Sequence, residues 1–165
     1  LVPGALVGNV LYFVLDFSDR ILKYNLDTRE ISAVCDPYAC YGKVVLMAME
    51  DGRLGFARVE SRLLMWSRED GPGKDDGWVQ SKVINLEALL PVEVISRPLE
   101  VVGFAYSVGL FFVATVDCLF SVDLMSSQAN KVIEGYDVYS VVPLMSFYTP
   151  GTDELMMVFL PSQLC

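Results

Sequence analysis

Two pairs of neighbouring carboxylates, Glu50-Asp51 and Glu69-Asp70, come nearest in type and spacing to acid–base chemistry in this sequence. A glycosidase would use such groups only if two of them faced each other across a cleft. Each pair is followed directly by a glycine and stands between two apolar runs, a pattern typical of a turn between strands. We therefore interpret both pairs as turns, and we predict no catalytic residue and no enzyme activity for this chain.

The sequence contains no histidine, which removes the usual general base and the commonest metal ligand. Any Ser-His-Asp or Cys-His arrangement within the chain is excluded for the same reason. The cysteines are Cys35, Cys40, Cys118 and Cys165, and only the first two are close, at a spacing wider than that of a usual zinc pair. We expect free, largely buried thiols, no metal, no cofactor, and a reducing compartment, cytoplasmic or nuclear.

The most polar segment spans residues 69–77 and contains Asp70, Lys74, Asp75 and Asp76. It lacks the ordered ligand spacing of an EF-hand, and Lys74 is followed by aspartate where a phosphate-binding loop needs serine or threonine. Trp78, which follows it, could stack on a bound peptide or sugar, or pack as a structural residue. We expect a solvated loop, and these five residues form the candidate interaction loop.

Composition favours stacked sheets. Of the 165 residues, 53% are hydrophobic and only 20% are charged. Continuous apolar runs without alternation are typical of strands that are covered on both faces. The net charge of −9 would repel a phosphate backbone, so we expect no nucleic-acid partner.

Residues 101–116 carry no charge and could be mistaken for a membrane span. The stretch has 16 residues, fewer than the roughly 18–20 that a membrane helix needs. It also contains Gly103, Ser107 and Gly109. We predict two buried strands joined by a tight turn near residues 107–109, and no membrane partner.

Apolar runs recur in pairs along the chain. The second run of each pair starts about ten residues after the first, as expected for neighbouring strands of a hairpin. The pairs recur about every 40 to 55 residues, the range of propeller blades. In this alignment Trp66 matches Tyr24 and Val122, so we expect Trp66 to be a core residue. The paired runs are residues 11–16 with 21–26, 54–59 with 63–68, and 110–115 with 119–124.

A further strand is expected on either side of each hairpin. Asn, Asp and Ser can bond nearby backbone amides, which predicts turns at residues 25–30 and 123–128; the loop at 69–77 replaces this turn in the middle unit. A short helical turn is expected at residues 85–90. The flanking strands are predicted at residues 5–8, 31–34, 44–49, 80–84, 100–104 and 131–134.

The expected fold is therefore all-β, with antiparallel four-stranded blades of an incomplete β-propeller of about three blades. A small sandwich or an open β-meander are the alternatives. Because known propellers close with 4–8 blades, the isolated chain is expected to expose apolar blade faces and to self-associate. The blades are expected at about residues 4–35, 44–84 and 100–135, with the start of a further blade at 136–150 and an unassigned tail at 151–165.

Several short segments resemble the C-terminal propeller region of the large F-box protein family of grasses. Each segment is a weak motif alone, and their order and spacing carry the resemblance over nearly the whole chain to Pro150. The segments are GALVGNVLYF (4–13), ILKYNLDTRE (21–30), MEDGRLGF (49–56), LMWSRE (64–69), GWVQ (77–80), VYSVVP (138–143) and SFYTP (146–150).

The resemblance implies a protein-interaction module that recruits the target of a cullin-RING ubiquitin ligase. In that family the N-terminal F-box binds a Skp-type adaptor. No F-box is recognisable in this chain, so adaptor binding is assigned to no residue here, and the target protein is not identified. The sequence after Pro150 departs from the family pattern. The alternative function is a carbohydrate-active or metal-dependent propeller enzyme whose active residues lie in missing blades.

Overall fold

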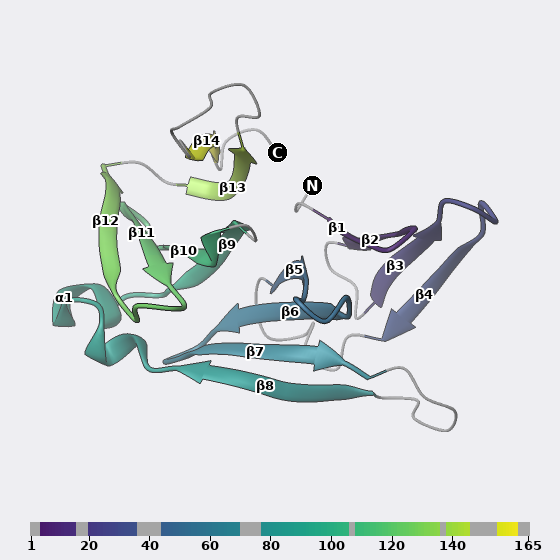
Figure 1. The fold of residues 1–165 in the computed structure, drawn as a ribbon. Coiled ribbons are helices and arrows are strands. Elements are labelled where there is room, and N and C mark those ends of the chain that lie inside the picture. Colours follow the sequence, from purple (N-terminus) through teal and green to yellow (C-terminus); the bar gives the residue numbers. More distant parts are fainter. Residues whose placement is uncertain are drawn as a thin grey trace.

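The computed structural model describes residues 4–15, 20–35, 44–69, 77–105, 108–135, 138–145 and 155–161. Its strands form three four-stranded sheets and one two-stranded sheet, each with its strands in sequential order (Figure 1). All strand pairs are antiparallel. The three four-stranded sheets are the blades that the paired apolar runs predict.

The strands of the three blades follow one another along the chain. Blade 1 consists of β1 (Ala5–Val7), β2 (Val10–Val14), β3 (Arg20–Asn25) and β4 (Ile31–Cys35). Blade 2 consists of β5 (Val44–Ala48), β6 (Leu54–Val59), β7 (Leu63–Arg68) and β8 (Trp78–Ile84). Blade 3 consists of β9 (Glu100–Ala105), β10 (Leu110–Ala114), β11 (Cys118–Asp123) and β12 (Ala129–Glu134). The predicted hairpin strands are confirmed, and each begins within about one residue of its predicted start.

The blades are arranged as in a propeller. The first strand of each sheet contacts the first strand of the next, so that β1 lies beside β5, β5 beside β9, and β9 beside β13. Figure 1 shows these strands toward the middle of the molecule, with β4, β8 and β12 outside. Propellers place four-stranded sheets around a central channel in this way. The fold is therefore all-β, three propeller blades followed by the pair β13 (Val138–Met145) and β14 (Leu155–Pro161).

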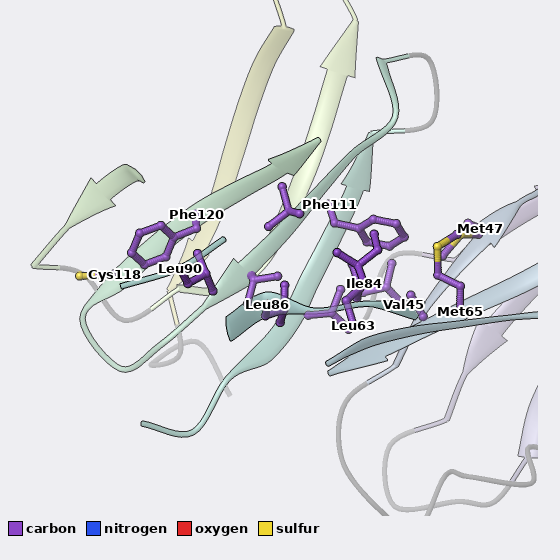
Figure 2. Packing of buried hydrophobic residues seen from close by; sticks show 14 residues of the cluster. Val45, Met47, Leu63, Met65, Ile84, Leu86, Leu90, Phe111, Cys118 and Phe120 are labelled. Atoms are coloured by element: carbon purple, nitrogen blue, oxygen red, sulfur yellow. The ribbon is translucent and has the colours of Figure 1, made fainter. Parts of the chain in front are cut away.

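Apolar side chains fill the space between neighbouring blades. Phe56 and Trp66 of blade 2 pack with Tyr12 and Ile21 of blade 1. Trp66 is 5% exposed, which confirms that it is a core residue. A second cluster joins blades 2 and 3 (Figure 2), and a third joins blade 3 to β13 through buried side chains that include Val141.

The connection between blades 2 and 3 contains the helical turns. The predicted turn is the 3-10 helix η2 (Leu86–Ala88), which begins where Asn85 Oδ1 accepts from the Glu87 amide at 3.2 Å. A second helix, α1 (Val92–Ile95), was not predicted. Residues 101–105 and 110–114 form strands, so a helix across 101–116 is excluded. Neither helix in the described ranges has the length and apolarity of a membrane-crossing helix.

The turn before the outer strand is built alike in blades 1 and 3. Asn25 Oδ1 accepts from the Asp27 and Thr28 amides at 2.9 and 3.1 Å. Asp123 Oδ1 accepts from the Met125 and Ser126 amides at 2.7 and 3.3 Å. These bonds confirm that the polar side chains define the turns, as Asx residues do.

The face of blade 1 that points away from blade 2 is apolar and accessible. Side chains alternate along a strand, so Tyr12 faces blade 2 and its neighbour Leu11 lies on the far face. Leu11 pairs across the strands with Tyr24. Tyr24 is half-buried, whereas its equivalents Trp66 and Val122, which lie behind a preceding blade, are 5% and 0% exposed. The far face of blade 1 therefore has the composition of a blade interface.

We predict that the 165-residue chain alone self-associates through this far face. Its accessible apolar side chains include Leu6 and Ile31, which are 53% and 68% exposed. Light scattering at increasing protein concentration should give a mass above that of the monomer, and Leu6→Lys with Ile31→Lys should lower it. Val92→Lys, at a side chain 71% exposed on α1, is the matched control and should change little. A monomer at every concentration would contradict the prediction.

Candidate functional site

A cleft of about 620 Å³ opens between blades 2 and 3 and is lined by methionine side chains. Met47 on β5 and Met65 on β7 belong to the core cluster between the blades. Figure 2 shows these two side chains at one end of that cluster, near Phe111, with Cys118 and Phe120 at the other end. The cleft is therefore the open end of a packed interface between two blades.

Two further methionines line the cleft from turns. Met49 follows β5, and its sulfur lies over Gly55, where an added Cβ would be 2.5 Å from Sδ. Gly55 thus leaves the room that the Met49 side chain occupies. Met125, in the turn between β11 and β12, is 86% exposed. Methionine is flexible and polarizable, so such a wall can adapt its shape to different apolar ligands.

The turn between β5 and β6 supplies the acidic side of the cleft. Glu50 and Asp51 line it, and Gly52 completes the turn with a φ of 77°. The Arg53 guanidinium binds Asp51 Oδ2 through Nε at 2.7 Å and Nη2 at 2.5 Å. These hydrogen bonds hold the pKa of the Asp51 carboxyl below its usual range, so this carboxylate is ionised at neutral pH. The interpretation of residues 50–52 as a turn is confirmed.

Lys82 links the two blades at the cleft. Its Nζ donates to the backbone oxygen of Leu124, on the turn that follows β11, at 3.0 Å. The Asp123 carboxylate of the same turn has a lowered pKa because the Met125 amide and the Ser126 hydroxyl and amide donate to it, with a smaller contribution from the Lys82 charge. The Lys82 ammonium therefore forms part of the cleft wall.

A smaller pocket of about 310 Å³ lies at the Cys118 end of the same blade interface. Four of its charged side chains form two pairs: Arg97 Nη1 lies 2.6 Å from Asp117 Oδ2, and Lys131 Nζ lies 3.0 Å from Glu134 Oε2. Glu93 also lines it. Burial raises the pKa of the Cys118 thiol, which keeps it protonated and unreactive. Most charged groups of this pocket are therefore already engaged with one another, so the methionine-lined cleft is the better candidate for binding a ligand.

The cysteines differ in exposure. Cys118 is buried, as expected, whereas Cys35 is an exposed free thiol at the end of β4, so the expectation of burial is wrong for Cys35. Cys40 and Cys165 lie outside the described residues. Within the described ranges, no three His, Cys, Asp or Glu side chains gather closely enough to hold a metal ion.

The candidate interaction loop is placed only at its ends, because Asp70, Lys74, Asp75 and Asp76 lie outside the described residues. The Glu69 amide donates to the Gly77 oxygen at 2.5 Å, so the loop starts and ends at one point. Glu69 Oε1 also lies 3.8 Å from Arg53 Nη1, which connects the base of the loop to the acidic turn of the cleft.

Trp78 lies on the opposite side of blade 2 from the cleft. It packs against the cluster between blades 1 and 2, with its ring edge-on to Phe56 at 4.8 Å. Its Nε1 donates to the Cys35 backbone oxygen at 3.2 Å. Trp78 is half-buried, and these contacts join the outer strands of two blades.

No family model matches the chain, and no curated protein matches it. Two solved structures from B. thetaiotaomicron are similar to it over most of its length. One, described as the extracellular domain of a one-component system, has 13% identity and a TM-score of 0.47 over 94% of this chain and 19% of that chain. The other, described as that of a hybrid two-component system, has 14% identity and a TM-score of 0.45 over 96% of this chain and 22% of that chain. The chain thus spans about a fifth of the length of these structures.

The methionine-lined cleft was not predicted from the sequence. Met47, Met49 and Met65 are visible as methionines in two apolar runs, residues 44–49 and 63–68, which are separated by the run at 54–59. Their convergence with Met125 depends on the register of blade 2 and on its packing against blade 3, which periodicity alone does not give.

Proposed function

We infer that this chain is a protein-interaction module that binds a target polypeptide in the methionine-lined cleft between blades 2 and 3. The observation that carries this proposal is an accessible apolar cleft of about 620 Å³, within the size range of ligand sites. Flexible methionine side chains are used at surfaces that accept several apolar partners. Binding, rather than catalysis, is the function proposed.

The resemblance to the grass F-box family points to the cellular process that this binding would serve. In that process the propeller recruits a target to a cullin-RING ubiquitin ligase, in the cytoplasm or nucleus, and an F-box elsewhere in the full polypeptide binds the Skp-type adaptor.

We predict that Met125→Lys abolishes or strongly weakens capture of target proteins by the full polypeptide. The substitution replaces an apolar side chain at the mouth of the cleft with a cation, and Met125 is 86% exposed, so folding should be preserved. Val92→Lys, at a side chain 71% exposed on α1, is the matched control. The measurement is quantitative affinity capture with wild type and both variants.

Targets that are lost with Met125→Lys and kept with Val92→Lys would support the cleft as the binding site. Capture of the same proteins at the same level by all three forms would refute it. Recovery of a Skp-type adaptor and a cullin with every form would support the ligase role separately, and their consistent absence would refute that role.

A further inference from the structure

We propose that the cleft selects a target segment that combines apolar side chains with basic ones, an inference that rests on the proposed function. The apolar part follows from the lining, where methionines are joined by Phe104 and Val108. The basic part follows from the charges around the opening. Both preferences are thus argued from the cleft and its surroundings, and not from the candidate interaction loop.

Carboxylates outnumber cations around the cleft. Within the described residues, the acidic side chains at or directly beside it are Glu50, Asp51, Glu69 and Asp123, and the basic ones are Arg53 and Lys82. The difference is four negative charges against two positive ones, or −2. The whole chain carries −9, so the long-range field has the same sign. Such a field attracts basic segments and raises their association rate.

Glu50 is a carboxylate at the cleft that a ligand can reach. Arg53 is paired with Asp51, whereas Lys82 donates to the neutral Leu124 carbonyl and keeps its charge. Glu50 is exposed, and no residue within the described ranges donates to its carboxylate. A lysine or arginine of a bound segment can therefore pair with Glu50 without breaking an existing ion pair. An acidic segment could reach Lys82 only against the net negative charge around the cleft.

The competing occupants are a neutral apolar segment and an acidic one. A neutral segment would gain the methionine contacts alone, and an acidic segment would gain them against the local field. Like charges brought together at an interface disfavour the wrong partner. Affinity should therefore decrease in the order basic, neutral, acidic.

The test uses short fluorescent peptides in which leucine alternates with lysine, serine or glutamate, titrated against the 165-residue chain. We expect the leucine–lysine peptide to bind most tightly. Glu50→Lys should weaken that peptide roughly 1.5- to fivefold at low salt, since an exposed ion pair contributes about 0.2–1 kcal/mol and about 1.4 kcal/mol is a tenfold change in affinity. The effect should shrink at about 1 M salt, where the Debye length is about 3 Å. Glu87→Lys, at an exposed carboxylate on η2, makes the same charge change away from the cleft.

Weaker binding with Glu50→Lys and unchanged binding with Glu87→Lys would support the inference. Equal loss with both variants would overturn it, because the peptide would then respond only to net charge. Equal affinity for all three peptides, lost with Met125→Lys, would overturn the basic preference and leave the proposed function standing. Binding of no peptide, or binding that Met125→Lys does not alter, would count against both.

Discussion

Phe56→Ala is expected to lower the free energy of unfolding by about 3–5 kcal/mol. Phe56 is 0% exposed and lies between two indole rings. Its ring stacks on Trp66 at 4.8 Å with an interplanar angle of 18° and meets Trp78 edge-on at 4.8 Å and 73°. Such aromatic pairs add about 0.5–1.5 kcal/mol each beyond the area that they bury. Alanine would leave a cavity between blades 1 and 2 and remove both ring contacts.

The measurement is urea unfolding at one fixed protein concentration, because self-association makes apparent stability depend on concentration. The chain has two tryptophans, Trp66 and Trp78, and both contact Phe56, so their fluorescence reports on this interface directly. Phe56→Leu is the control and should cost less, because leucine refills part of the cavity. A loss below about 1 kcal/mol for Phe56→Ala would mean that blade 2 repacks around the gap, in contradiction to the prediction.

The hairpin strands of the three blades could be predicted because they are short, mostly apolar runs bounded by turn residues. Runs such as residues 110–114 and 118–123 carry that pattern strongly, and their pairing follows from their spacing. The polar composition of residues 69–77 interrupts the repeat and predicts a loop, of which only the ends, Glu69 and Gly77, lie within the described residues. Local sequence was sufficient to predict those segments whose structure depends only on one strand and the next strand along the chain.

Other features depend on contacts between distant segments, and the sequence did not reveal them. The helix α1, Val92–Ile95, is too short to show a helical period. Strand β14 lies in the tail that was left unassigned, and it becomes recognisable only through its pairing with β13. Cys35 looks apolar enough for a core position, but it ends an outer strand and is exposed. The methionine-lined cleft exists only because blades 2 and 3 pack together.

Gly103→Ala is expected to cost about 1–3 kcal/mol, because an added methyl group would overpack the contact between blade 3 and β13. A Cβ at Gly103 would lie 2.6 Å from the backbone oxygen of Val141 and 2.9 Å from its Cβ. Val141 is 0% exposed, and a backbone oxygen cannot rotate away as a side-chain end can. The two strands would have to separate, which should raise amide hydrogen exchange along Val138–Met145 more than in blade 2.

Gly55→Ala is the matched control, since it places the same methyl group in another buried strand. Its Cβ would lie 2.5 Å from the sulfur of Met49, at the end of a flexible side chain, and 3.1 Å from the backbone oxygen of Trp66. Met49 can move into the cleft, and alanine reduces the entropy of the unfolded chain by about 0.4–1 kcal/mol relative to glycine. Gly55→Ala should therefore be nearly neutral in urea unfolding, with hydrogen exchange in β13 unchanged. Equal losses from the two substitutions would contradict the prediction. Gly103, which faces backbone, would then be packed no more tightly than Gly55, which faces a movable side chain. A loss at Gly103 alone, with faster exchange confined to β13, would establish that this glycine sets how closely blade 3 and β13 pack.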